Sequence, residues 1–369
     1  MGAKSINLSQ WSRIATRSSR SLAIPRRAFS TSPAWQKAGV VPSFNKSSST
    51  ELDDLLKTIR DLIIMPGYLS PAQQDLVYKP KHRKMLINDE VTANIAGEKF
   101  RLEYIDVEHV RPSPRKALLN ALEKFQEKDM DMLPGLLEGI HKSQPKVTAR
   151  PAVVRMVITR AAKFNREDVL LECVRQAEAT GLRLGNEDCA RNLMCSYLAK
   201  AKSEGTAEAL KKAIKWSEMT LDLLEDPKHV SEYPDLPDPR TLPEVVAPHV
   251  ELTAIKAKQT GDANDIGQVE QYGKRLLALS PNARKPTKED YGYLNIWLND
   301  NALGLYTAAN SAGEVLGSGS ETGASLTKWA SKLKEQMTPM YNSMKDTDWA
   351  QEKTRTGIQK YKEVFGDES

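Results

Sequence analysis

Apolar residues recur at helical spacing along most of the chain, beginning near residue 50. Thr50 is placed to cap a first helix, and the Pro66-Gly67 pair ends it. Leucine and isoleucine recur on one face of this helix at intervals of three and four residues, which indicates that one side is buried. These residues are Leu52, Leu55, Ile59 and Ile63.

Two further elements are expected before residue 113. Ser70 followed by Gln73 forms a capping box, with Pro71 in the first turn, and this predicts the start of a second helix. Residues 91–106 are instead rich in residues that favour strands, and they turn at Ala96-Gly97. This pattern predicts a short β-hairpin or an extended segment.

The helical period returns over residues 113–226, where a helix begins roughly every 16 to 20 residues, so that a helix pair recurs at roughly 35 to 40 residues, within the range of solenoid repeats. Asn165 and Asn186 are placed to cap helices, and Gly181 to end one. A single helix pair leaves an apolar face exposed, and stacking of pairs buries it. The expected fold is therefore mainly all-α, an α-solenoid of stacked helical hairpins.

A Pro-rich and acidic stretch near residues 225–248 interrupts the helices and predicts a long loop. Further helices are expected after it, with "GSGSETG" at 317–323 as a flexible loop between two of them. The later helices are expected near 249–260, 265–279, 288–316, 325–344 and 349–365.

The N-terminal composition differs from that of the rest of the chain. Residues 1–50 contain eight Lys and Arg and no Asp or Glu, and they are rich in Ser and Thr. This composition is typical of a mitochondrial transit peptide, and the alternative is a disordered basic tail that binds an anionic surface. "RRAFSTSPAWQKAG" also resembles the two-step cleavage site of fungal mitochondrial matrix proteins, through Arg27, Phe29 and Ser32. That resemblance implies cuts after Ala28 and then after Gln36.

The expected organisation follows from these features. It consists of a transit peptide (1–36), a disordered linker (37–50), N-terminal helices with an extended segment (51–112), a helical-repeat region (113–226), a Pro-rich acidic loop (227–247) and a C-terminal helical region (248–369).

Charge changes the interpretation of function. The whole chain has a formal charge of +5, and because eight positive charges lie in residues 1–50, the remainder carries −3. Any RNA contact of the mature protein must therefore come from local basic clusters rather than from bulk charge.

Three such clusters occur, and one of them, between residues 142 and 166, contains no acidic residue. Gathered on one side of a solenoid, these cations would neutralise phosphates, whereas the alternative is an ordinary solvated helix face. The candidate RNA-binding residues are Lys79, Lys81, Arg83, Lys84, Arg111, Arg115, Lys116, Lys142, Lys146, Arg150, Arg155, Arg160, Lys163 and Arg166.

The motifs of enzymes and metal sites do not occur. The sequence has no P-loop, and "GSGSETG" and the "SLTK" at 325–328 lack the companion motifs of a phosphate loop or a serine enzyme. The five histidines are scattered, which indicates surface or loop positions, and the three cysteines are expected to be reduced and packed. Trp216, Trp297, Trp329 and Trp349 are expected to be packing anchors. We therefore expect no enzyme, no catalytic or metal-binding residue, no cofactor and no small-molecule substrate.

Other residues bear on the class of protein. "VRMVITRAAKFNREDVLLECVRQAEATGLRL" resembles a pentatricopeptide-type unit, and "YGKRLLALSPN" resembles the end of a tetratricopeptide unit. No apolar run approaches the roughly 18 residues that cross a bilayer, so the protein is not expected to be integral to a membrane.

With its transit signal, helical repeats and basic clusters, the chain is similar in type to lineage-specific fungal mitochondrial ribosomal proteins. That resemblance implies a matrix protein that scaffolds rRNA and neighbouring ribosomal proteins. Two alternatives stay open: a helical-repeat factor that binds a mitochondrial transcript, and an assembly factor for a respiratory complex.

Overall fold

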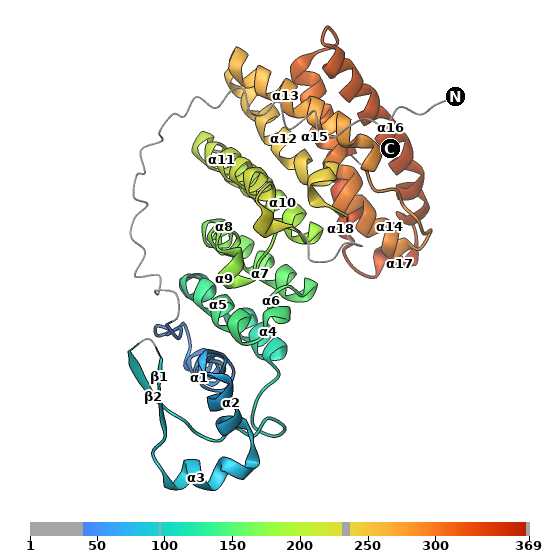
Figure 1. Ribbon diagram of the computed structural model, residues 1–369. Helices are drawn as coiled ribbons and strands as arrows, with labels where there is room; N and C mark the ends of the chain where they lie inside the picture. Colours follow the sequence, from blue (N-terminus) through green and yellow to red (C-terminus); the bar gives the residue numbers. More distant parts are fainter. Residues whose placement is uncertain (1–39, 96, 231–236, 367–369) are drawn as a thin grey trace, which may run out of the picture. The chain divides into compact units, whose positions relative to one another are not determined.

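The computed structural model describes residues 40–95, 97–230 and 237–366. The expected transit peptide lies outside this part of the chain. Helices dominate the described residues (Figure 1). The N-terminal elements are α1 (Thr50–Ile59), the π-helical turn η3 (Arg60–Ile64), the 3₁₀ turn η4 (Met65–Tyr68), α2 (Pro71–Tyr78), η5 (Pro80–His82), α3 (Arg83–Asn88), β1 (Thr92–Ile95) and β2 (Glu98–Arg101).

The helix starts follow local rules. Ser49, rather than Thr50, caps α1, because its side chain accepts a hydrogen bond from the Leu52 amide at 3.2 Å. The capping box at α2 is present as expected: the Ser70 amide donates to Gln73 Oε1 at 3.0 Å, and the Gln73 amide donates to Ser70 Oγ at 3.4 Å. Two otherwise unpaired amides of the first turn are thereby satisfied.

The two strands form an antiparallel hairpin in which Ile95 pairs with Glu98, as the pattern of residues 91–106 predicts. Gly97 has a φ of 94°, a conformation that glycine adopts without steric cost. The hairpin and the segment after it cover a small apolar cluster that is separate from the main core. Its buried members are Leu69, Val77, Leu86, Ala93, Leu102 and Ile105.

The segment just before α1 is part of the core, so the expectation of a disordered linker is wrong for residues 40–49. Val41 is buried, and Ser48 donates from its amide and its hydroxyl to the two carboxylate oxygens of Asp129, at 2.9 Å and 2.6 Å. Asp129 also accepts from the Gln126 amide. The polar composition of this segment predicts disorder, but hydrogen bonds to the distant Asp129 carboxylate hold it in place.

The repeat region contains α4 (Pro114–Lys124), η6 (Glu127–Met132), α5 (Leu133–Ser143), α6 (Pro145–Thr148), α7 (Pro151–Lys163), α8 (Glu167–Arg175), α9 (Ala177–Thr180), α10 (Glu187–Glu204) and α11 (Ala207–Leu224). After it come η7 (Pro227–His229), η8 (Pro239–Thr241), α12 (Pro243–Thr260), α13 (Ala263–Leu279), η9 (Ser280–Asn282), α14 (Tyr291–Trp297), the π-helical turn η10 (Leu298–Ala302), α15 (Leu303–Leu316), α16 (Glu321–Met344), α17 (Asp348–Gln351) and α18 (Thr356–Phe365).

The helices stack in chain order, which is the solenoid-like arrangement that the repeats predict. One layer runs through α1, α4, α7, α10, α12 and α15, each of which packs on the next, and α8, α11 and α13 pack beside it as second members of hairpins (Figure 1). Helix α5 packs against η3, η4 and α8. The buried apolar residues of these helices form one continuous core from Val41 to Tyr361. Because each helix pair buries the open face of its neighbour, the stack is stabilised step by step.

Helix boundaries differ from the expectation in three places. Asn165 does not cap α8 but lies in the left-handed region with a φ of 53°, which asparagine tolerates better than most residues. Helix α12 begins at Pro243, inside the stretch expected to be a loop. Helix α16 begins at Glu321, because Ser320 caps it by accepting from the Gly323 amide at 3.3 Å, so the flexible loop is shorter than expected.

Asn186 and Gly181 do behave as expected. Asn186 caps α10 by accepting from the amides of Asp188 and Cys189. Gly181 ends α9 with a φ of 70°. Both signals depend on a few adjacent residues, which is why the sequence alone reveals them.

Candidate RNA-binding surface

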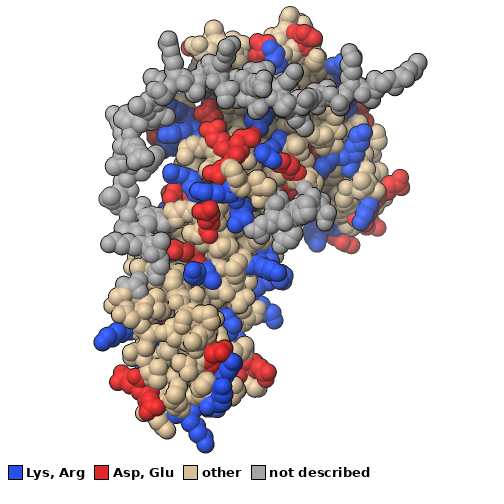
Figure 2. Space-filling model, viewed as in Figure 1, with Lys and Arg blue, Asp and Glu red and all other residues tan. Residues whose placement is uncertain are grey.

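The first basic cluster lies on the turn between α2 and α3. Lys79, Lys81, Arg83 and Lys84 are all exposed, and Figure 2 shows Lys and Arg side chains projecting where Figure 1 places α3, with acidic side chains close by. Lys79 is paired with Asp75, with Nζ and Oδ2 2.6 Å apart, and this hydrogen bond lowers the pKa of the Asp75 carboxyl. Because the pair is solvent-exposed, it holds Lys79 only weakly.

Two aromatic rings orient the arginines of this region. The Arg83 guanidinium lies 5.5 Å from the centre of the Tyr104 ring, and that of Arg111 lies 5.4 Å from the centre of the Tyr78 ring. Arg111 Nε is buried and has no hydrogen-bond partner among the described residues. Burial raises the pKa of the Tyr78 hydroxyl against the opposing effect of the Arg111 charge, so the ring stays neutral.

Arg111 belongs to the second basic cluster, and its contact with Tyr78 places it next to the first cluster, which begins at Lys79. The backbone is held by a hydrogen bond from the Ile105 amide to the Val77 carbonyl at 2.9 Å, which fixes residues 102–106 against the end of α2. Arg115 and Lys116 follow in the first turn of α4, and both are exposed.

The third cluster extends from the end of α5 to the turn before α8. Lys142, Lys146, Arg150, Arg155 and Lys163 are exposed, and Arg160 is half-buried. On α7, Val153, Val154, Val157, Ile158 and Ala161 face the core, so Arg155, Arg160 and Lys163 occupy the opposite, outer side. Helices α4 and α7 pack together, and the second and third clusters thus lie on neighbouring helices.

Arg166 does not fit the expectation of an uncompensated basic run. Its Nη2 lies 2.7 Å from Asp131 Oδ1, and its Nε lies 3.0 Å from Asp168 Oδ1. The acids come from η6 and from the first turn of α8, so the run is acid-free in sequence but not in space. Arg166 pairs with two carboxylates, whereas Lys79 pairs with one.

Other charged groups that the sequence did not single out are internal links between repeats. Glu167 is buried, and its carboxylate pairs with Lys200 Nζ at 2.8 Å. Burial raises the pKa of Glu167 against the lowering effect of the Lys200 hydrogen bond. Arg191, 8% exposed, similarly bridges Asp188 at 2.8 Å and Asp300 at 3.5 Å, and so joins α10 to η10.

Two histidines are buried. His229 lies in the short turn after α11, so the expectation of a surface or loop position is wrong only for His249, which is on helix α12. His229 Nδ1 accepts from the Leu184 amide at 3.1 Å. His249 is on α12, and its Nδ1 lies 2.7 Å from Ser217 Oγ. The His249 and Tyr272 rings pack edge to face, with their centres 4.2 Å apart. Ser217 Oγ also lies 2.8 Å from the Ile214 carbonyl oxygen, and His249 Nε2 is buried without a hydrogen-bond partner among the described residues.

The cysteines and tryptophans follow the expectations with one exception. Cys173 and Cys189 are buried, whereas Cys195 is exposed, so the expectation of packing is wrong for Cys195. Burial raises the pKa of the Cys189 thiol to about 12. Trp297 is buried and Trp216, Trp329 and Trp349 are partly buried against the core.

Among the described residues, no three His, Cys, Asp or Glu side chains are grouped so as to hold a metal ion. None of the described helices combines the length and the apolarity that a membrane span requires.

Comparisons with known proteins identify the family. The chain is 30% identical over 275 residues to the small ribosomal subunit protein mS27 of Neurospora crassa, which covers 69% of each chain. Two solved structures, a de novo designed helical repeat protein and a protein filament, each align with 62% of this chain. Their TM-scores are 0.26 and 0.23, their identities are 17% and 19%, and the alignments cover 99% and 93% of their own lengths. The sequence model of the mitochondrial ribosomal protein mS27 family matches residues 27–363. The chain belongs to this family.

Proposed function

We propose that the protein is a structural component of the small subunit of the mitochondrial ribosome, in the mitochondrial matrix. The match to the family over residues 27–363 carries the proposal, because it includes nearly all of the described helices. The Neurospora relative bears the name of a small-subunit protein, which supports the choice of subunit. Residues 1–36 serve in this proposal as the cleaved transit peptide.

Its mechanism is scaffolding by a fixed array of cations. Arg83 and Arg111 rest on Tyr104 and Tyr78, so their guanidinium groups lose little conformational freedom when they meet a phosphate. Lys81 and Lys84 add flexible charges beside Arg83, and the exposed cations of α7 add others on a further helix of the stack. Such contacts position a protein on RNA without reading its sequence.

Neighbouring ribosomal proteins would use other parts of the surface. Ile87, Val107 and Val110 are exposed to 64%, 46% and 58%, and they lie on α3 and on the loop after the hairpin. Apolar side chains of this size are common at the centres of protein interfaces. Neither the transcript-binding factor nor the respiratory assembly factor is favoured by an observation of the structure or by the family.

The test is sedimentation of the tagged protein from a mitochondrial lysate, with and without magnesium chelation. The protein should co-migrate with the small subunit, and it should follow that subunit when chelation separates the particle. The Arg83→Gln/Lys84→Gln variant should wash off the subunit at lower salt, because each lost phosphate contact reduces the salt-dependent affinity. Lys211→Gln/Lys212→Gln, an exposed pair on α11, is the matched control. Migration of the unmodified protein in light fractions alone would refute the proposal.

A further inference from the structure

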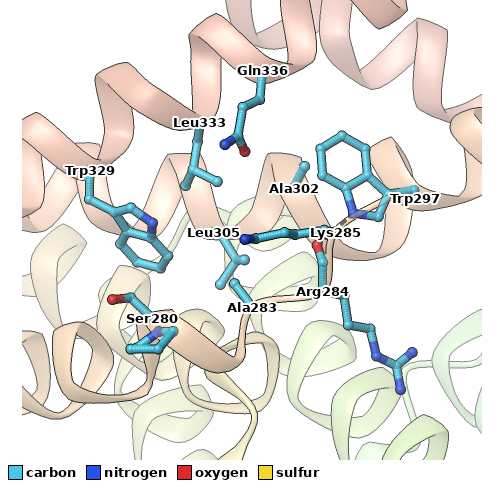
Figure 3. Close-up of a pocket in the computed structure, with 11 residues that line it drawn as sticks. Ser280, Ala283, Arg284, Lys285, Trp297, Ala302, Leu305, Trp329, Leu333 and Gln336 are labelled. Atoms are coloured by element: carbon cyan, nitrogen blue, oxygen red, sulfur yellow. Dashed lines mark hydrogen bonds between the residues drawn. The ribbon is translucent and has the colours of Figure 1, made fainter. Parts of the chain in front are cut away.

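A pocket of about 200 Å³ lies in the C-terminal region, away from the three basic clusters in sequence (Figure 3). It opens where the loop after α13 meets α15 and α16. Pockets for drug-sized ligands usually measure about 300–1,000 Å³, so this one is suited to a single planar ring rather than to a whole cofactor. Its lining includes Lys285, Trp297, Leu305, Trp329, Leu333 and Gln336.

The two tryptophans have different roles. Trp297 is 3% exposed, and its Nε1 donates to the Arg284 carbonyl at 2.7 Å, which fixes the loop against α14. Trp329 is only partly buried, and its ring stands at the side of the pocket opposite Trp297 (Figure 3). The ring of Trp329 therefore presents a surface on which a planar group can stack.

Lys285 is the cation of the pocket. Its neighbour Arg284 is committed elsewhere, because its guanidinium pairs with Glu187 and its amide donates to Glu244 Oε1 at 2.9 Å. Figure 3 shows Arg284 pointing away from the pocket, whereas the side chain of Lys285 extends across its centre. Lys285 is exposed and forms no ion pair in the described structure.

The charge around the pocket is positive. Residues 280–288 contain no acid and carry Lys285 and Lys288 besides the paired Arg284, and the exposed Lys332 lies one helical turn before Gln336 on α16. The nearest acids in sequence, Glu289 and Glu335, are exposed, and Glu335 lies further round α16 from Trp329 than Lys332 does.

We propose that this pocket binds one unpaired base of a single-stranded RNA, with the base stacked on Trp329 and the adjoining phosphate bound by Lys285. Gln336 supplies an amide that can pair with the edge of the base. Stacking on an aromatic ring beside a cationic groove is the usual recognition of single-stranded nucleic acid. The Lys285 cation that extends across the pocket favours a ligand with a negative charge over an apolar side chain of a neighbouring protein. The identification of this RNA as rRNA rests on the proposed function. The affinity of the pocket for unpaired RNA does not depend on it.

The experiment measures binding of a fluorescein-labelled single-stranded oligoribonucleotide to the purified full chain by fluorescence anisotropy, over a series of salt concentrations. Lys285→Gln should lower the affinity, and the slope of log affinity against log salt should fall by about 0.7, the value for one phosphate of a single strand. Trp329→Ala should lower the affinity by about 5- to 150-fold without changing the slope, because stacking is not ionic. Trp329→Phe should restore most of the loss. Lys211→Gln should change neither quantity.

Thermal unfolding of each variant shows whether it is folded, and Trp329→Phe with Lys285→Gln keeps the test decisive if Trp329→Ala does not fold. Unchanged affinity and slope in the folded variants would overturn the inference, as would a lack of any binding of single strands by the unmodified chain. If the same variants bind RNA normally but leave the small subunit in sedimentation, the pocket docks a protein. That outcome also overturns the inference, but it leaves the proposed function standing.

Discussion

Replacement of Gly181 by alanine tests whether the repeat junction is as tightly packed as the structure shows. Gly181 ends α9 with a φ of 70°, and a Cβ added there would lie 2.2 Å from both His141 Nδ1 and Thr148 Oγ1. These two atoms are themselves 3.0 Å apart and hydrogen-bonded, and Thr148 is 1% exposed. Neither side chain can therefore move aside without losing a contact.

The expected cost has two parts. A non-glycine residue in the left-handed region costs about 1–2 kcal/mol. Separation of the His141–Thr148 hydrogen bond costs about 0.5–1.5 kcal/mol more. Gly181→Ala should therefore lower the free energy of unfolding by about 1.5–3.5 kcal/mol.

Gly205→Ala is the matched control. Gly205 ends α10 with a φ of 62°, and an added Cβ would meet nothing within 4 Å, so only the conformational part, about 1–2 kcal/mol, should be lost. Urea unfolding followed by circular dichroism compares the midpoints of the two variants at unchanged slope. Equal losses in the two variants would refute the reasoning, because they would mean that the junction relaxes around the new methyl group.

Two further predictions concern buried polar groups. Burial lowers the pKa of His249 to about 4, so between pH 4 and 6.5 the unfolded chain binds a proton that the folded chain does not. The free energy of unfolding is therefore highest above pH 6.5 and falls as the pH drops towards 4, by at most about 3 kcal/mol from this group. His249→Phe should reduce the fall in unfolding free energy between pH 7 and pH 5, and an unchanged pH profile would show that other groups cause it. Asp129→Ala should lower the free energy of unfolding by about 2–3 kcal/mol, because the part-buried donors of Ser48 and Gln126 lose their charged acceptor, and it should open residues 40–49 to limited proteolysis. Asp131→Ala, whose side chain is 69% exposed, is the control and should cost little; equal protease resistance in the two variants would contradict the anchoring role of Asp129.

The positions of the basic clusters were visible in the sequence, but their surroundings were not. Nothing in the spacing of Arg111 and Tyr78 shows that one lies over the other, since the two positions are 33 residues apart along helix, hairpin and loop. The compensation of Arg166 by Asp131, and the anchoring of Ser48 by Asp129, join segments 35 and 81 residues apart. The pocket beside Trp329 likewise combines a loop with two helices that no sequence motif connects.

The sequence by itself determined the all-α class, the hairpin near residue 97, the capping box at Ser70 and the helix end at Gly181. Each of these depends on side-chain periodicity or on hydrogen bonds within a few residues, so it is encoded locally. Only the tertiary structure decided that Asn165 turns left-handed, that His229 and His249 are buried, and which cations face solvent. Those outcomes depend on which side chains, distant in sequence, pack next to each residue. That is decided only when the helices pack closely together in the folded protein.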